Sequence, residues 1–159
     1  LLQVREILRR RTLDSAVEIR IRASFDPSLA CTATQAVLGS AGATTLFKNF
    51  VGAILPDVWY VSALADRLAY IDLATNGTDP DIQARFNSDL GTTGCLEGAS
   101  WYYGYDLNAG PNQLDLVSTL LHEFAHGLGF LTLVDDNGLR AEVRFPARTG
   151  KDDDPHSDR

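Results

Sequence analysis

The chain has 159 residues, 45% of them hydrophobic and 22% charged, which is the size and composition of one globular domain. This apolar content excludes global disorder, and no apolar run approaches the roughly 20 residues that a membrane-spanning helix needs. The formal net charge of −7 argues against binding nucleic acid by phosphate neutralisation. We therefore expect neither membrane insertion nor a nucleic-acid partner.

The first part of the chain combines one clear strand with less regular segments. Residues 2–11 mix leucine and isoleucine with Arg and Glu, as in a short amphipathic helix. Residues 16–25 alternate apolar and polar side chains, which predicts a strand with one buried and one wet face. Small residues and glycines over 28–45 predict a loop with a short strand around 36–38. A further short element is expected within 45–53.

The middle of the chain predicts a helix followed by two strands. Residues 62–74 have apolar side chains near helical spacing, with Ser62 as the expected N-cap. Residues 82–87 alternate again and predict a second half-buried strand, and the aromatic run 101–103 predicts a third.

A long helix is predicted next, and a charged segment follows it. Asn112 is the expected cap, with Asp115 in a capping-box-like position, and Gly127 and Gly129 are natural end points. The elements together indicate an α+β fold, with residues 1–137 as a single domain. Residues 138–159 are highly charged and show little periodicity, so we expect them to be a mobile C-terminal segment.

Two cysteines, Cys31 and Cys95, are separated by 64 positions. They can form a disulfide in an oxidising compartment, or each can be a small buried apolar side chain. We expect the disulfide.

The predicted long helix contains the pattern H-E-x-x-H. His122 and His126 are four residues apart, so their side chains project from one helix face and can bind a single zinc ion. The intervening Glu123 can act as general base towards a metal-activated water. A metal-bound histidine also needs an outer-shell partner. The candidates for this partner are Asp115, Asp106 and Tyr102.

A catalytic zinc site needs a third protein ligand, and the sequence leaves its identity open. In the extended H-E-x-x-H-x-x-G-x-x-H form, a third histidine follows the glycine. Here Gly129 is present, but Thr132 stands at the position of that histidine. The available substitutes are Asp135, Asp136, His156 and Glu142.

Several stretches of the chain resemble bacterial secreted zinc metallopeptidases of the metzincin-like kind. The segment HEFAHGLGF at 122–130 resembles the active-site helix of these enzymes. Three stretches are similar to the catalytic region of protease-associated (PA) domain-containing peptidases. They are ADRLAYIDLATNGTDPDIQARFNSDLG, GCLEGASWYYGYD and LDLVSTLLHEFAHGLGF. The resemblance covers roughly residues 13–137. One departure is that the chain contains no methionine, so the methionine turn of metzincins is missing.

This resemblance implies a zincin-like catalytic subdomain, in which a twisted mixed β-sheet packs on a backing helix and an H-E-x-x-H active-site helix. It implies one catalytic zinc ion held by His122 and His126, with Glu123 as base, in a secreted protein that acts on protein or peptide substrates. An edge strand, at 82–87 or 101–105, would cradle an extended peptide by strand addition. For the aromatic run at 101–103, we favour core packing over substrate contact.

Two functions from different classes follow. The first is a zinc-dependent endopeptidase. The alternative is a non-catalytic zinc- or peptide-binding domain derived from a truncated metallopeptidase. A base beside the histidines favours the first, because a structural zinc site is closed by four protein ligands, whereas the missing third histidine favours the second. A serine hydrolase lacks support because the chain has no G-x-S-x-G pattern.

Overall fold

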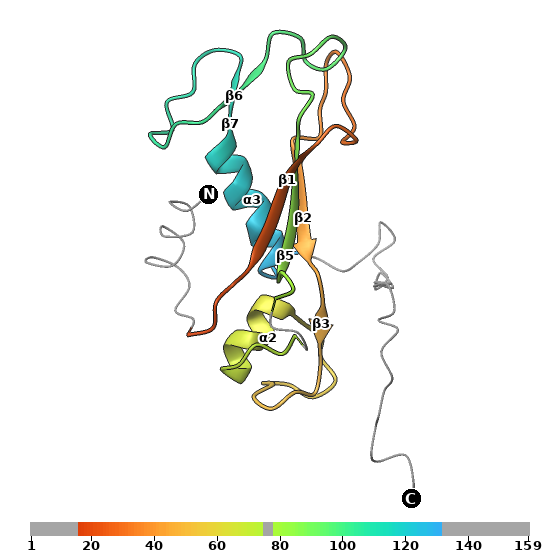
Figure 1. The fold of residues 1–159 in the computed structure, drawn as a ribbon, viewed down its shortest axis with the longest axis vertical. Coiled ribbons are helices and arrows are strands. Elements are labelled where there is room, and N and C mark those ends of the chain that lie inside the picture. Colours follow the sequence, from red (N-terminus) through yellow and green to blue (C-terminus); the bar gives the residue numbers. More distant parts are fainter. Residues whose placement is uncertain (1–15, 75–77, 132–159) are drawn as a thin grey trace, which may run out of the picture.

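A computed structural model describes residues 16–74 and 78–131 of the chain. The helix expected at 2–11 and the charged segment 138–159 lie outside these ranges. Within them the fold is a small α+β structure with mixed β-sheets and two helices (Figure 1). No helix among the described residues is long and apolar enough to cross a membrane.

A three-stranded sheet forms the centre of the fold. Its strands are β1 (Ile21–Asp26), β5 (Ile82–Asn87) and β2 (Gly39–Ala43), in the order β1-β5-β2. β5 pairs in parallel with β1 and antiparallel with β2. The strand expected at 82–87 is therefore confirmed, but it is the central strand, so the prediction that it could be an edge strand is wrong.

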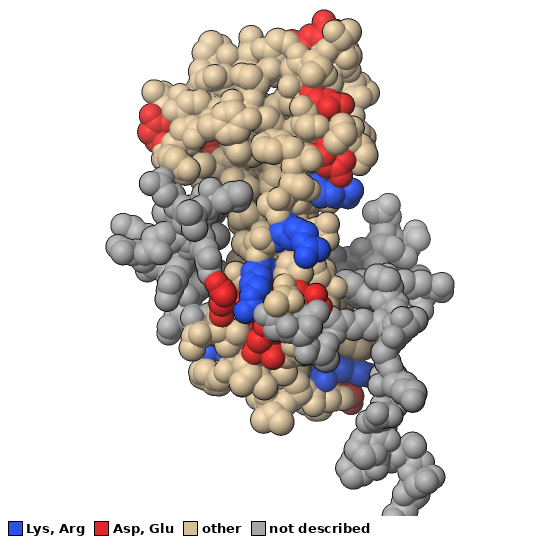
Figure 2. Space-filling view, in the orientation of Figure 1, with Lys and Arg blue, Asp and Glu red and all other residues tan. Residues whose placement is uncertain are grey.

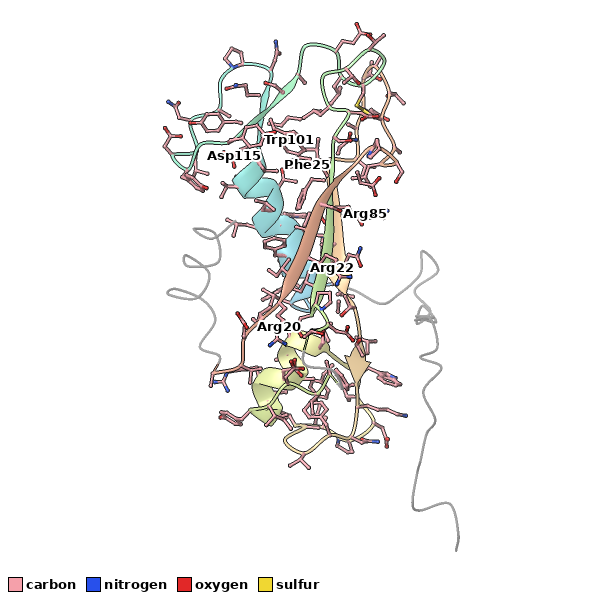
Figure 3. All side chains as sticks on the ribbon, viewed as in Figure 1. Arg20, Arg22, Phe25, Arg85, Trp101 and Asp115 are labelled. Carbon is pink, nitrogen blue, oxygen red and sulfur yellow. A yellow bond between two sulfur atoms is a disulfide. The ribbon has the colours of Figure 1, made fainter. Side chains whose placement is uncertain are left out.

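The strand expected at 16–25 begins later, at Ile21, where pairing with Ile82 starts. Its alternation is confirmed, because Ile21 and Ala23 pack against the core while Arg22 is exposed on the opposite face. Figure 3 shows Arg22 in a row with Arg20 and Arg85, and Figure 2 shows basic side chains in a row on this face of the molecule. Neighbouring carboxylates pair with this row, as in the ion pair of Arg85 with Asp26 at 3.3 Å.

The segment 28–45 is a loop with one short strand, as its small residues predicted, but the strand lies at another position. It contains β2, at 39–43 rather than around 36–38, and Ala36 forms only an isolated bridge with Cys31. Glycine and alanine have low strand propensity, but here they lie under a helix that packs closely on the strand. Tertiary packing therefore determines this strand.

Helix α3 (Leu116–Gly127) packs across β2 and β5 on one face of the sheet (Figure 1). Its first turn is capped by Asp115, whose carboxylate accepts the Ser118 N–H at 2.6 Å. The prediction that Asn112 caps this helix is wrong, because the residues after it form β7 (Gln113–Asp115). The buried core between helix and sheet consists of Ala84, Phe86, Leu120 and Phe124.

β7 pairs in parallel with β6 (Ser100–Tyr102), next to the start of α3. The third expected strand is thus present, although it ends at Tyr102. Trp101 is 8% exposed and donates its Nε1–H to the Asn87 carbonyl at 2.9 Å. Core packing is therefore confirmed for Trp101, whereas Tyr103 is exposed.

A second group of elements lies at the other end of the sheet. β3 (Leu46–Phe47) pairs antiparallel with β4 (Tyr60–Val61), and helix α2 (Ser62–Ala69) packs against both strands. The helix expected over 62–74 therefore ends early, at Tyr70 in the left-handed conformation. Ser62 is not its N-cap, because its hydroxyl donates to the Asp81 carbonyl at 3.0 Å.

The expected disulfide is present between Cys31 and Cys95, whose Cα atoms are 5.1 Å apart. It links the loop that follows β1 to the loop that follows β5. Closing a loop of this length stabilises a fold by about 4 kcal/mol in the chain-entropy model.

Candidate metal centre on helix α3

The two histidines of the H-E-x-x-H pattern converge on one point. The Nε2 atoms of His122 and His126 lie 3.2 Å apart, and the two rings are nearly perpendicular. Tetrahedral zinc with Zn–N distances of about 2.0–2.1 Å separates two ligand nitrogens by about 3.3–3.4 Å. The two side chains therefore fit a shared zinc ion with little adjustment.

The end of α3 places a backbone carbonyl beside Nδ1 of His126, which leaves Nε2 as the nitrogen that faces His122. The chain turns at Gly129, where φ is 102°, and the Phe130 N–H donates back to the Ala125 carbonyl at 3.0 Å. This turn places the Phe130 carbonyl oxygen 2.9 Å from Nδ1 of His126. Because a carbonyl only accepts, the proton belongs on Nδ1, and Nε2 of the neutral ring keeps its lone pair.

The hydrogen-bond partner of the His126 ring is thus a backbone carbonyl and none of the three side chains expected as outer-shell partners. Asp115 caps the opposite end of α3, about 16 Å from His126 along the helix axis. Tyr102 pairs with Asp115 in the β6–β7 ladder, and its hydroxyl donates to Asp106. That hydrogen bond raises the pKa of Tyr102 and lowers the pKa of Asp106. All three residues therefore belong to the end of the fold away from the histidines.

The side chain of Glu123 extends from α3 towards strand β2. A β-carbon built on Gly39 of β2 would be 3.0 Å from Cγ of Glu123, so the aliphatic part of this side chain crosses directly over the strand. Glu123 is half-buried, whereas His122 is exposed. The potential base is therefore held against the edge of the sheet, beside a pair of accessible imidazoles.

The third ligand is not found among residues 16–74 and 78–131, in which no group of three His, Cys, Asp or Glu side chains could hold a metal. Its four candidates lie outside the described residues. They are Asp135, Asp136, His156 and Glu142.

The edge strand beside α3 is β2, which sequence reasoning did not identify. The Asn87 N–H donates to Leu38 and the Thr44 N–H donates to Asp81, so every second residue of this segment bonds to β5. The residues between them direct their backbone N–H and C=O groups to the free edge, with which no other strand of the described residues pairs. These residues are Gly39, Ala41 and Ala43.

An apolar cavity of about 210 Å³ lies near the first half of α3, away from the histidines. Its lining includes Phe25 of β1, Leu120 of α3 and the exposed Tyr103 and Tyr105. Phe25 was not a candidate from sequence, whereas Tyr105 lies within 101–105, one of the two segments expected as a peptide-binding edge strand. This cavity contains no metal-binding side chain.

Two buried carboxylates lie in the other half of the fold. Asp66 of α2 is 3% exposed and Asp81, just before β5, is 5% exposed. The Arg20 N–H donates to Asp81 at 2.8 Å, and the Leu73 N–H donates to Asp66 at 2.9 Å. Burial raises the pKa of Asp66 to about 6; the Leu73 N–H opposes the rise and the adjacent Asp81 adds to it.

The fold and site define a small α+β domain that presents a histidine pair and a carboxylate on one helix. The model of the SPBPB7E8-like family matches residues 59–144, more than half of the chain. The chain therefore belongs to the SPBPB7E8-like family. No curated protein and no solved structure matches it.

Proposed function

We propose that this protein is a zinc-dependent endopeptidase. The observation that carries the proposal is the convergence of the His122 and His126 Nε2 atoms at 3.2 Å, with Glu123 on the same helix turn. The resemblance to metzincin-like, PA domain-containing peptidases supports the same function. Under this proposal the fold is the zincin-like subdomain that the resemblance implies.

Zinc held by the two histidines would act as a Lewis acid, polarising a peptide carbonyl and making water nucleophilic near neutral pH. The residues of the chain supply the rest of the chemistry. The Phe130 carbonyl keeps the proton of His126 on Nδ1. A carboxylate oxygen of Glu123 accepts the proton of the attacking water and returns it to the leaving amine.

The substrate is an extended peptide that pairs with the free edge of β2. Backbone groups of Gly39, Ala41 and Ala43 are directed to this edge, and Glu123 lies next to its first residue. Main-chain pairing of this kind gives affinity with little dependence on side chains. The strand brings the peptide bond close to the base.

The remaining parts of the proposal concern residues and surroundings outside the described ranges. Asp136 and Asp135 follow the Gly129 turn closely in sequence, and His156 and Glu142 are the alternatives for the third ligand. The disulfide between the two cysteines fits an oxidising compartment, which supports a secreted protein.

The experiment is casein hydrolysis by the wild type and Glu123→Gln, purified in parallel, with zinc content measured for both. We expect the variant to keep its zinc and to lose at least about 99% of its cleavage rate. Equal cleavage by both proteins would mean that Glu123 is not the base. Zinc binding without cleavage by either protein would instead favour a non-catalytic zinc- or peptide-binding domain.

A further inference from the structure

Gly39 occupies the narrowest contact between α3 and the edge strand. A β-carbon at this position would lie 3.0 Å from Cγ of Glu123 and 3.1 Å from Cδ1 of Phe86. Ordinary contacts between carbon atoms are about 3.5–4.0 Å. A methyl group there would therefore have to push one of these two side chains away.

Position 39 is a glycine because there is no room for a side chain, not because its backbone adopts a conformation that favours glycine. Glycines with positive φ among the described residues include Gly91 and Gly129, but Gly39 is not one of them. Gly42, three positions later on the same strand, is a useful contrast. A β-carbon at Gly42 would meet nothing within 4 Å.

Of the two neighbours, Glu123 is the one that can move. Phe86 is 3% exposed, belongs to the buried core and packs edge-to-face on Phe25. Glu123 is half-buried and does not belong to the buried core cluster of the described residues. A methyl group at Gly39 would therefore displace Cγ of Glu123, and the displacement would carry through to the carboxylate.

We propose that Gly39 is a positioning residue, which sets the distance between the Glu123 carboxylate and a peptide bound along the free edge of β2. The inference rests on the proposed function, in which Glu123 is the base. Gly39 lies between the base and the proposed peptide, because its Cα faces Glu123 while its backbone groups point to the free edge. Its small size lets the base approach the scissile bond closely.

The test compares Gly39→Ala with Gly42→Ala as the matched control, each in the wild-type and the Glu123→Gln background. Steady-state cleavage of a casein-derived peptide gives kcat and KM, and zinc content is measured for every variant. Because a misplacement of about 1 Å in an active site can cost about 100-fold, we expect Gly39→Ala to lower kcat at least tenfold with KM and zinc unchanged. Gly42→Ala should leave all three quantities unchanged.

The two backgrounds separate positioning from general damage. If Gly39 acts through Glu123, Gly39→Ala should not lower the residual rate of the Glu123→Gln protein any further. Wild-type kcat in Gly39→Ala, or an equal loss in both backgrounds, would overturn the inference. If Glu123→Gln itself remains fully active, the proposed function fails instead.

A thermal-unfolding cycle tests the contact without any activity, and it applies even if Gly39→Ala is too unstable for kinetics. Glu123→Ala removes Cγ, so the loss of Tm caused by Gly39→Ala should be smaller in that background than in the wild type. An equal loss of Tm in both would show that the methyl group does not meet Glu123, and would overturn the inference.

Discussion

Gly127, the last residue of α3, allows the helix to rest directly on the central strand. It is buried against Ile82 of β5, whose side chain is fully buried. A β-carbon at Gly127 would lie 2.5 Å from Cγ2 of Ile82 and 2.8 Å from both Cγ1 and Cδ1. Compared with a normal contact of about 3.5–4.0 Å, this is an overlap of about 1 Å with three atoms at once.

We predict that Gly127→Ala destabilises the protein, although alanine favours helix more than glycine does. The gain in helix propensity is at most about 1 kcal/mol. Overpacking a well-packed core costs about 1–3 kcal/mol or more, and the triple overlap with a fully buried side chain points to the upper end. The net loss in the free energy of unfolding is about 2 kcal/mol, which lowers Tm by roughly 5–10 °C.

Thermal unfolding followed by circular dichroism measures this loss, with Ile82→Ala and the double variant completing a cycle. Ile82→Ala alone should cost about 2–5 kcal/mol because it leaves a cavity. The new methyl of Gly127→Ala occupies part of that cavity, so the double variant should be more stable than the sum of the single losses predicts by at least about 1 kcal/mol. Additive losses, or a single Gly127→Ala variant as stable as the wild type, would refute the reasoning.

Three further predictions concern the rest of the fold. The pKa of Asp66 is raised from its ordinary value of 3.8 to about 6, so its stabilising protonated form is lost as pH rises through this window. The free energy of unfolding should therefore fall between about pH 4 and 6, and Asp66→Asn should flatten that slope in urea titrations at several pH values. Replacing Cys31 and Cys95 with alanine should cost about 4 kcal/mol in urea unfolding, whereas an unchanged midpoint would contradict a stabilising disulfide. Added zinc should raise the Tm of the wild type, and His126→Ala should lose both the zinc and this rise; unchanged zinc content would disprove the site.

The features that could be predicted from the sequence depend on local patterns. Alternation placed the strand at 82–87 with its observed bounds, because Ala84 and Phe86 are buried on the face under α3 while Gln83 is exposed on the other face. The spacing of His122 and His126 placed both on one helix face, as found. The disulfide was also correct, although its support was the number of cysteines rather than their position.

The features that could not be predicted depend on tertiary contacts. β2 is made of glycine, alanine and serine; it is a strand because it pairs with β5, and its residues are small where α3 packs closely on it. Asn112 was a reasonable cap by residue type, but pairing of β7 with β6 delays the helix to Asp115. The partner of His126 is a backbone carbonyl, and a carbonyl at Phe130 leaves no signal in the residue type.

The Cys31–Cys95 disulfide turns the middle of the chain into a covalent ring that contains both β2 and β5. The most exposed apolar side chains of this ring belong to the turn between β3 and β4, where Val51 is 93% exposed and Ile54 is 70% exposed. A protease that cuts this turn opens the ring but releases no fragment, because the two pieces remain joined through the sulfur atoms. A nicked molecule therefore keeps β2 covalently linked to the piece that contains α3, and it separates into two bands on a gel only after reduction.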